Sequence, residues 1–382
     1  MRKLLFGVLA LLCVACSPSA KETAALLDKG FAEIMEKHEA VGLMVAAVKD
    51  GEIVYNASYG YKDLENKVPV GVDDKLRIAS ISKTFVATAI MQLVEQEKID
   101  LDADISSYMG FQLRNPNFPD VPVTVRMLLS HTSSMSDANG YFSFDYFNPA
   151  VSPTWQKAWN SYQPGTKYQY CNLGFNTLGA IIEIVSGERF DEYMKRHIFE
   201  PLGVDASHNV VDFDPAQLIG IYRYDASTGS FEKSDAYAQN AADLENYKMG
   251  YSTPVFSPTG GVKISAKDLA KVMIMHMNKG AVGDVRIISQ ESSSLMQSEI
   301  THTNYEGECY GMAMISTDDM FGDARAVGHD GLALGAYTAM YWVKDADFGI
   351  VVMTNGCTGK TDKAFANILC ESAQLLKAHL NK

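Results

Sequence analysis

The strand-forming segments of this chain fall into two groups near its opposite ends, and this spacing limits the folds available to it. Residues 42–48 and 53–59 are two short β-rich runs, and the Asp50-Gly51 pair between them is a strong hairpin signal. Strand patterns return only late in the chain, at residues 310–315, 337–343 and 349–354. We therefore expect the two groups to form two halves of one antiparallel sheet.

Helical patterns flank these strands and fill the middle of the chain. Apolar residues recur at helical spacing over residues 21–38, and residues 80–97 contain neither Gly nor Pro. Shorter helices are expected at residues 125–130, 173–185, 190–198 and about 362–380. The sequence thus predicts an α/β fold in residues 21–382, with a sheet-and-helix lobe at about 21–105 and 256–382 and an inserted all-helical lobe at about 106–255. A cleft between the lobes is the expected site.

The N-terminal segment has the pattern of an export signal. Two basic residues precede an apolar run over residues 4–15 that is too short to span a bilayer. The run ends in Cys13-Val14-Ala15-Cys16, and small residues before a Cys are typical of bacterial lipoprotein cleavage sites. Residues 1–20 are therefore expected to be a signal and anchor region, with a lipid on Cys16 that holds the protein at a membrane of the bacterial cell envelope. Cys13 stands where the pattern usually has Leu, so a soluble periplasmic product stays open as the alternative.

Composition narrows the classes of function. The 382 residues carry a formal charge of −13, and a chain this acidic is a poor ligand for nucleic acid. It contains no Gly-rich phosphate loop and no Cys or His clusters at zinc spacing, so neither a cofactor nor a metal is predicted. One disulfide and the oligomeric state remain open. Most of the four cysteines that follow the leader are expected to be buried apolar residues: Cys171, Cys309, Cys357 and Cys370.

The first chemical pattern is a Ser and a Lys three residues apart at the start of a predicted helix. This spacing places the side chains of Ser80 and Lys83 on one helix face. Burial lowers the pKa of a Lys, so a neutral Lys83 is expected to act as base toward a Ser80 nucleophile. The Ser80 N–H, unpaired in the first helical turn, is expected to face the developing oxyanion. The pair alone is a weak signal, because such pairs occur by chance on polar helix faces.

A second pattern is the Tyr-x-Asn at residues 170–172, which follows the Pro164-Gly165 turn and precedes a helix. Side chains two residues apart in an extended stretch point the same way, so Tyr170 is expected to relay a proton and Asn172 to bind a substrate amide. Tyr146-Phe147-Asn148 is a competing Tyr-x-Asn, but it lacks the preceding turn and the following helix.

A third pattern is the Gly-rich segment at residues 327–335, which precedes a strong strand. Gly331 would let the backbone approach a ligand closely. The Leu332 N–H at the strand edge is expected to be the second oxyanion donor. His329 is expected to orient a carboxylate or to polarise Tyr170.

In this order and at these separations, the three patterns resemble the serine β-lactamase and penicillin-binding protein superfamily, in particular its class C β-lactamase, D-alanyl-D-alanine carboxypeptidase and esterase branch. The resemblance runs from about residue 25 to the C-terminus and is also carried by residues 128–133 and 257–262. It implies a β-lactamase-like sandwich, an antiparallel sheet flanked by helices, with an all-helical lobe. The family motifs fall on Ser80 and Lys83, on Tyr170 and Asn172, and on His329 and Gly331.

The chain departs from this family at His329-Asp330-Gly331, where β-lactamases of the branch usually have Lys-Thr-Gly. A Lys is a permanent cation for a substrate carboxylate, whereas His329 is mostly uncharged near neutral pH and Asp330 adds a negative charge. Leu332 stands where many relatives have Gly and would narrow the pocket. We therefore expect a cell-envelope serine hydrolase acting through a Ser80 acyl-enzyme on a D-Ala-type peptide or a small ester. The alternatives are a β-lactamase and a non-catalytic relative that binds cell-wall fragments.

Three further patterns are interpreted as structural. Ser130-His131 suggests a dyad, but adjacent residues on a helix or turn point in different directions. Cys309 stands where a nucleophile elbow has Ser, yet no strand-turn-helix pattern surrounds it and a Gly-bearing strand is favoured. Several other histidines are expected to be solvated: His38, His197, His208, His276, His302 and His379.

Overall fold

The structure, a computed structural model, describes residues 18–238, 244–362 and 364–381. Most of the predicted export signal, including Cys16, lies outside these residues. Within the described residues, no helix is both long enough and apolar enough to cross a lipid bilayer.

One antiparallel sheet organises the molecule and confirms that strands from the two ends of the chain pair with each other. In the described part of the chain it has nine strands, in the order β10-β11-β12-β13-β14-β15-β1-β2-β3. Strand β1 pairs with β2 on one side and β15 on the other, which joins the first and last thirds of the sequence. The strands are β1 Gly42–Lys49, β2 Glu52–Asp63, β3 Val68–Pro69, β10 Thr301–His302, β11 Cys309–Tyr310, β12 Ile315–Thr317, β13 Ala326–Ala333, β14 Ala336–Val343 and β15 Phe348–Thr354.

Two turns of this sheet test the sequence signals. Asp50 and Gly51 have φ values of 52° and 77°, the left-handed pair that a two-residue hairpin needs, so the predicted β1–β2 hairpin is confirmed. The single strand predicted at residues 310–315 is wrong, because β11 and β12 form a hairpin there. Ala313 has a φ of 57°, which interrupts an extended strand, and the Gly311 N–H donates to the Met314 carbonyl across the turn.

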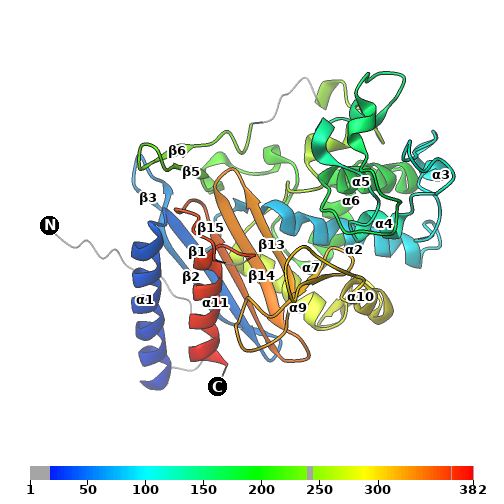
Figure 1. Cartoon of the computed structure of the whole chain (residues 1–382). Coiled ribbons are helices and arrows are strands. Elements are labelled where there is room, and N and C mark those ends of the chain that lie inside the picture. The colour runs from blue at the N-terminus through cyan, green and yellow to red at the C-terminus, as the bar shows by residue number, and fades with distance from the viewer. Residues whose placement is uncertain (1–17, 239–243, 363, 382) are drawn as a thin grey trace.

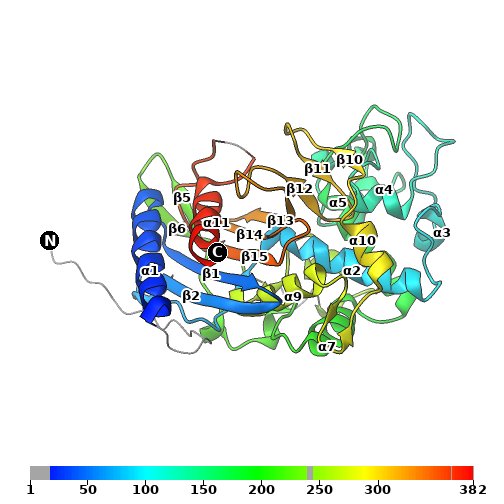
Figure 2. The ribbon, with the colours of Figure 1, turned by 90° about the horizontal axis from the view of Figure 1, so that it is seen from below.

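Helices cover both faces of the sheet. Helices α1 (Pro18–His38) and α11 (Asn367–Leu380) lie side by side on one face, and α9 (Ala266–Met277) packs on the other (Figures 1 and 2). Strand β1 is buried on both faces: alternate residues join one hydrophobic cluster or the other. Both predicted terminal helices are confirmed, although α11 begins five residues later than expected.

A second group of helices extends from one end of the sheet. Helix α2 (Ser82–Glu95) runs from the sheet into this group (Figure 1). Helix α5 lies at its centre and contacts α2, α3, α4 and α6. It ends at Gly187, whose φ of 75° suits the left-handed cap that stops a helix. The predicted helices of this region are confirmed as α4 Val125–Leu129, α5 Asn172–Ser186 and α6 Phe190–Met194, which continues as a π-helix over Lys195–Phe199. The short helices α3 Ser106–Met109 and α7 Glu200–Leu202 were not predicted.

The sheet and the helical region are closely joined. The Tyr222 N–H donates to the Asn355 carbonyl, which places the β5–β6 hairpin beside the end of β15, and α2 packs against α5. The division into lobes at about residues 106 and 255 stays a prediction. The remaining elements are β4 Leu76–Arg77, β5 Tyr222–Asp225, β6 Ser230–Lys233, β7 Lys263–Ile264, β8 Ala281–Val282, β9 Val285–Arg286 and α10 Gln290–Met296.

Five of the eight histidines and three of the four described cysteines are buried. His38, His208 and His276 are at most 2% exposed, so the expectation that they are solvated is wrong. Tertiary packing covers them, and the polarity of their sequence neighbours carries no sign of it. Three of the four described cysteines are buried, as expected: Cys171, Cys309 and Cys357.

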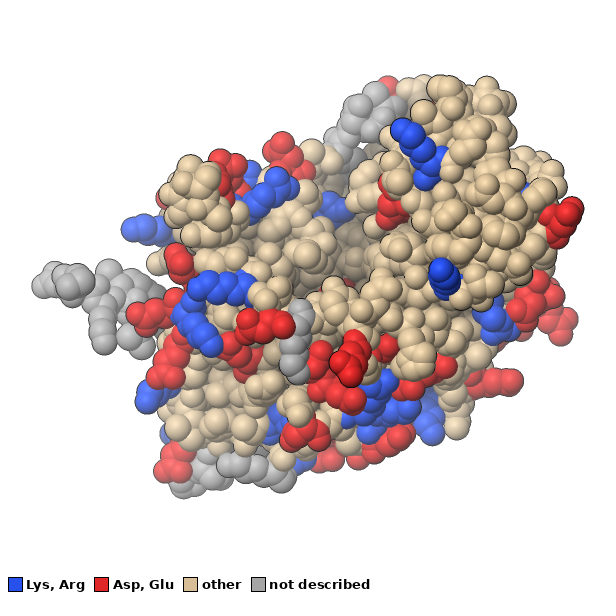
Figure 3. Space-filling model, in the orientation of Figure 1, with Lys and Arg blue, Asp and Glu red and all other residues tan. Residues whose placement is uncertain are grey.

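Charged side chains are unevenly distributed over the surface. On the face shown in Figure 3, acidic and basic groups intermingle over the sheet and its covering helices, while much of the helical region is uncharged. Among the described residues of this face, no continuous basic surface is present of the kind that nucleic acid needs.

Candidate active site

Ser80 lies in a 3₁₀ turn, Ala79–Ile81, immediately before α2. The Lys83 Nζ donates to the Ser80 Oγ over 3.0 Å and to the Thr259 carbonyl over 2.9 Å. Burial lowers the pKa of Lys83 to about 7, against the opposing effect of carboxylates such as Asp137. The structure therefore holds an amine that is partly neutral at pH 7 beside the Ser80 hydroxyl.

The turn that presents Ser80 is unusual in its backbone and in its packing. Ala79 has a φ of 49°, a left-handed conformation that a residue with a Cβ seldom adopts. Strand β13 packs directly on this turn, and a Cβ at Gly331 would lie 2.4 Å from the Ile78 carbonyl oxygen. Gly331 is thus needed for close approach of the backbone, and its predicted role in substrate binding stays a prediction. The helix predicted from Ser80 begins at Ser82 instead.

Tyr170 approaches the same two side chains from the extended segment before α5. Its ring centroid lies 4.8 Å from the Lys83 Nζ. Burial raises the pKa of Tyr170 well above 10, and the neighbouring Ser80 hydroxyl offsets part of this rise. Its hydroxyl has no partner with hydrogen-bond geometry within the described residues. The phenol therefore keeps its proton at neutral pH and is available to a group that enters from the cleft.

Asn172, the first residue of α5, is held by two residues from other parts of the chain. Its Nδ2 donates to Asp137 over 2.8 Å, and its Oδ1 accepts from the Thr259 hydroxyl over 3.0 Å. The Asp137 carboxylate also accepts from the backbone N–H groups of Asn172 and Leu173, so it caps α5 from outside. Asp137 could not be predicted from the sequence, because its partners Asn172 and Leu173 lie 35 and 36 residues away and no local pattern marks it.

Thr259 joins the two sequence motifs. Its carbonyl accepts from Lys83 and its hydroxyl donates to Asn172, so one residue contacts both the Ser-x-x-Lys and the Tyr-x-Asn segment. The segment at residues 257–262 is part of the family resemblance in the sequence, which gives Thr259 no role. In the structure it sets the distance between the two motifs.

His329 is buried, with both ring nitrogens engaged. Its Nδ1 faces the Asp330 carbonyl over 2.5 Å, and since a carbonyl only accepts, this nitrogen carries the proton. The Nε2 then accepts from the Tyr310 hydroxyl over 3.0 Å. Burial and the nearby Lys83 lower the pKa of His329 to about 3, so the ring is neutral. A neutral ring with its single N–H in use has no charge or donor to offer a carboxylate.

His131 packs against the site without forming a dyad with Ser130. The Ser130 Oγ donates to the Arg126 carbonyl, while the His131 ring lies tilted against the Tyr170 ring with the centroids 4.1 Å apart. The His131 Nδ1 accepts from the Cys171 N–H. This arrangement agrees with the structural interpretation, and it gives His131 a part in positioning Tyr170 that the sequence pattern did not suggest.

The competing patterns have structural roles. The Ser82 Oγ is buried and accepts from the Val262 N–H. Cys309 lies in β11, a strand as favoured, with its thiol against the His302 Nδ1. Tyr146 lies in a 3₁₀ turn, and neither it nor Asn148 lines the cleft that contains Ser80.

A cleft of about 450 Å³ brings most of the predicted residues together. Ser80, Tyr170, Asn172, His329 and Leu332 line it, and Leu332 is 61% exposed at its rim. In the described part of the sheet, β12 pairs with β13 only as far as Gly328, so the edge that carries Leu332 has no strand beyond it. That the Leu332 N–H is an oxyanion donor stays a prediction.

Two carboxyl groups that the sequence did not connect also line this cleft. Burial raises the pKa of Asp330 to about 6 and that of Glu308 to about 7. Burial is the main cause of both shifts, and the nearby charge of Asp330 adds to the rise in the pKa of Glu308. The described residues include no group of three or more His, Cys, Asp or Glu side chains placed to hold a metal ion.

Several known proteins are similar to this chain in sequence and in fold. The chain is 26% identical over 343 residues to penicillin-binding protein 4 of Amycolatopsis lactamdurans, covering 85% of this chain and 84% of that protein. The octameric penicillin-binding protein homologue of Pyrococcus abyssi has a TM-score of 0.74 and 26% identity, over 93% of this chain and 77% of that one. D-amino acid amidase from Ochrobactrum anthropi has a TM-score of 0.72 and 20% identity, over 96% and 99%.

A family model described as beta-lactamase matches residues 27–373. That range contains the sheet, the helical region and every residue placed above around Ser80. The chain therefore belongs to the beta-lactamase family and is a serine hydrolase.

Proposed function

We propose that this protein is a cell-envelope hydrolase that forms an acyl-enzyme on Ser80. The observation that carries the proposal is the buried Lys83 Nζ, 3.0 Å from the Ser80 Oγ, with a pKa lowered to about 7. A neutral amine at this distance can take the Ser80 proton as the Oγ attacks the carbonyl carbon of the substrate.

Lys83 and Tyr170 divide the proton transfers in this proposal. Lys83 is the base, because burial favours its neutral form, and Tyr170 is the acid, because burial keeps its phenol protonated. Tyr170 gives its proton to the leaving oxygen or nitrogen as the C–O or C–N bond breaks. Lys83, beside the Tyr170 ring, then returns the Ser80 proton to the phenolate. Water releases the acyl group and restores Ser80.

Two further contacts hold the substrate. The backbone N–H groups of Ser80 and Leu332 are the proposed oxyanion donors. Asn172 has a second Nδ2 hydrogen beyond the one that Asp137 accepts, and this donor is proposed to bind a carbonyl of the substrate. Because Asp137 and Thr259 already fix the amide, Asn172 is oriented before substrate arrives.

The charges in the cleft support an acyl donor without a carboxylate at the His329 position. His329 is neutral, and Asp330 and Glu308 place carboxyl groups in the same cleft. An anionic group bound beside His329 would meet a neutral ring and two potential anions, while the basic groups Arg77 and Lys83 come from other segments. We therefore propose an amide or ester substrate, such as a D-amino acid peptide, a D-amino acid amide or a small ester. The D-amino acid amidase with this fold is an example of such chemistry.

The envelope location rests on two observations. The N-terminal residues have the pattern of a lipoprotein signal that ends at Cys16. A relative that covers most of the chain is named as a penicillin-binding protein. Lipid on Cys16, and contact with a membrane through it, are part of the proposal.

Parallel labelling tests the proposed nucleophile. The protein is incubated with a fluorophosphonate, a fluorescent penicillin and a chromogenic ester, and the mass of the Ser80 peptide and the turnover of each compound are measured. Ser80→Ala is expected to lose every adduct, while Ser82→Ala, which changes a buried neighbour, is expected to keep them.

Each outcome of this test decides between the candidate functions. A persistent penicillin adduct with ester or amide turnover supports the proposal. Rapid turnover of penicillin would assign the protein as a β-lactamase. Absence of any adduct on Ser80 would contradict the proposed nucleophile and favour a relative that only binds cell-wall fragments.

A further inference from the structure

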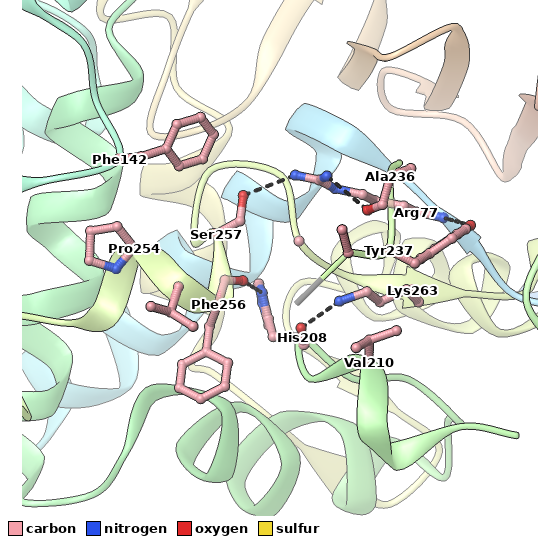
Figure 4. A pocket seen from close by; sticks show the side chains of 13 residues that line it. Arg77, Phe142, His208, Val210, Ala236, Tyr237, Pro254, Phe256, Ser257 and Lys263 are labelled. Carbon is pink, nitrogen blue, oxygen red and sulfur yellow. Dashed lines mark hydrogen bonds between the residues drawn. The ribbon is translucent and has the colours of Figure 1, made fainter. Parts of the chain in front are cut away.

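A second pocket adjoins the Ser80 cleft, and Figure 4 shows the side chains that line it. Its volume is about 300 Å³. Three residues, Arg77, Phe142 and Ser257, line both this pocket and the Ser80 cleft, so the two spaces share a wall. The mechanism proposed above uses none of the residues found only in the second pocket.

Two basic side chains face this pocket from neighbouring strands. Arg77 on β4 and Lys263 on β7 are directly opposite in the antiparallel ladder, so their side chains leave the same face. Lys263 is only 6% exposed. Like charges in this arrangement repel each other, and a buried charge costs free energy unless an opposite charge compensates it.

Within the described residues, neither of these two cations forms an ion pair. The Lys263 Nζ donates to the His208 carbonyl, and the Arg77 guanidinium donates to two carbonyls and to the Ser257 hydroxyl (Figure 4). All of these acceptors are neutral. By contrast Lys75, another buried lysine, contacts a carboxylate at 2.6 Å. The ammonium of Lys263 keeps two further hydrogens for another acceptor.

Two carboxylates that act on Lys263 through their charge form their hydrogen bonds and ion pairs with other residues. Asp191 accepts from Arg189 at 2.6 Å and Asp212 accepts from the Ser207 hydroxyl at 2.5 Å. Both favour the charged form of Lys263 from a distance, but burial and the adjacent Arg77 outweigh them and lower its pKa to about 7. An anion placed in the pocket would relieve this repulsion.

His208 adds a polar atom of a different kind. Its Nδ1 donates to the Phe256 carbonyl over 3.0 Å, which leaves its Nε2 as an acceptor. This Nε2 is buried and has no partner within the described residues, although the side chain is only 2% exposed. It could accept from the protonated oxygen of hydrogen phosphate or from an N–H beside a carboxylate.

We infer that this pocket binds a small oxyanion, a phosphate or a carboxylate group, between Arg77 and Lys263. The group has two possible sources: a free anion, or a carboxylate at the far end of a substrate that reaches across the shared wall from Ser80. The second source rests on the proposed function and the first does not. In either case the site is distinct from the His329 position, where the ring is neutral and two carboxyl groups line the cleft.

Binding is tested without any substrate turnover. The unfolding midpoint and the heat of binding of the full chain are measured with inorganic phosphate and with acetate, against chloride at the same ionic strength. The wild type is expected to bind saturably and to be stabilised. Lys263→Met is expected to lose affinity by about tenfold or more, and Lys263→Arg to retain it. Lys267→Met is the control, because Lys267 is a half-exposed lysine on α9 and its substitution removes the same charge. This variant is expected to bind the anions with the affinity of the wild type.

The unfolding midpoint in chloride separates an anion site from a purely structural role. If Lys263 is an uncompensated buried charge, Lys263→Met unfolds at the same temperature as the wild type or at a higher one. If Lys263 instead stabilises the fold through its hydrogen bond to the His208 carbonyl, Lys263→Met unfolds at a lower temperature than the wild type. Failure of the wild type to bind either anion, or wild-type affinity in Lys263→Met, would overturn the inference.

Pairs of substrates identify the source of the anion. Two esters that differ only in a distal carboxylate or its amide are compared by kcat/KM. The site is assigned to the substrate if kcat/KM is higher for the ester with the carboxylate, and if both added phosphate and Lys263→Met abolish this difference. The kcat/KM of the amide ester must stay unchanged under both conditions. Anion binding without such a preference assigns it to a free anion. If the wild type hydrolyses neither ester but still binds phosphate, the proposed function is contradicted, while the inferred anion site is still supported.

Discussion

At the scale of single residues, the same burial drives Lys83 and Tyr170 in opposite directions. Loss of water disfavours the charged form of each group, so the pKa of Lys83 falls to about 7 and that of Tyr170 rises well above 10. Near neutral pH the amine can then accept a proton while the phenol still holds one. The division of labour between them follows from their charge types, not from any difference in their surroundings.

The pH dependence of activity tests this division. Below pH 7 Lys83 gains a proton and loses its function as base, so kcat/KM for a chromogenic ester is expected to fall with decreasing pH through about 7 and to level off above it. Lys83→Met should lower kcat/KM by roughly 10²–10⁴-fold and remove this limb. Glu308→Gln is the control, since Glu308 titrates in the same range. A limb that persists in Lys83→Met, or disappears in Glu308→Gln, would contradict the assignment.

Glu308 makes a separate prediction about stability. Burial raises its folded-state pKa from 4.5 to about 7, so the folded protein retains a proton that the unfolded chain has already lost in this interval. The free energy of unfolding is therefore expected to fall as pH rises from about 4.5 to 7 and to stay low above that. Glu308→Gln, which stays neutral, should match the wild type at pH 4 and be more stable at pH 8 by about 1–3 kcal/mol. Urea unfolding at both pH values measures the difference; equal gains at both would rule out the titration of Glu308 as the cause.

At the scale of elements, the position of Ser80 depends on how β13 meets the 3₁₀ turn before α2. The sequence predicted a helix that starts at Ser80, but the turn at Ala79–Ile81 comes first and Ala79 is left-handed. The cause lies far away in the chain: Gly331 lets β13 pack on the turn, and the hydroxyl of Thr338 on β14, 260 residues from Ile78, donates to the Ile78 carbonyl. Local helical composition cannot reveal a contact of this range.

Gly331→Ala tests the importance of this contact. The added Cβ would lie 2.4 Å from both the Ile78 carbonyl and the Thr338 Oγ1, so the strand and the turn must move apart. We expect a loss of roughly 1–3 kcal/mol in stability and a loss of kcat on the order of 100-fold. Gly174→Ala in α5 is the matched control, because its nearest foreign atom lies at 3.4 Å and a helical Ala is favourable. Thermal unfolding and ester kinetics measure both effects; wild-type kcat in Gly331→Ala would show that Ser80 does not depend on the contact.

At the scale of the whole molecule, the sheet separates two hydrophobic clusters. One lies with α9, α2 and the helical region, and the other lies beneath α1 and α11 (Figure 2). Phe31 on α1 is fully buried in the second cluster, where its ring centroid is 5.3 Å from that of Tyr59. A substitution that weakens the packing of α1 on this cluster is therefore expected to lower the free energy of unfolding without changing the geometry of the Ser80 cleft.

Phe31→Ala is the corresponding prediction. Removal of this ring should cost roughly 3–5 kcal/mol of folding free energy, while kcat/KM of the folded protein at 25 °C stays within about twofold of the wild type. Leu26→Ala, a 54% exposed position on the same helix, is the control and should leave the unfolding midpoint unchanged. A proportional loss of kcat/KM in Phe31→Ala would mean that α1 docking and the cleft are coupled.

Much of the fold could be predicted because its signals are local. Residue periodicity located α1, α2, α5 and the central strands, and Asp50-Gly51 located the hairpin that joins β1 and β2. The β11–β12 hairpin was missed because its turn contains a left-handed Ala, which has no sequence signature. The buried His208 and His276 were missed for a related reason, since their cover comes from distant segments.

For this protein, the sequence by itself determined which side chains are present and how they are spaced: Ser80 and Lys83 one helical turn apart, Tyr170 and Asn172 on one side of an extended stretch. Only the tertiary structure decided their chemistry. The lowered pKa of Lys83, the cap that Asp137 places on α5 and the paired cations Arg77 and Lys263 all arise between segments distant in the chain. Desolvation and charge pairing depend on what surrounds a group in space, and a linear pattern carries no record of those neighbours.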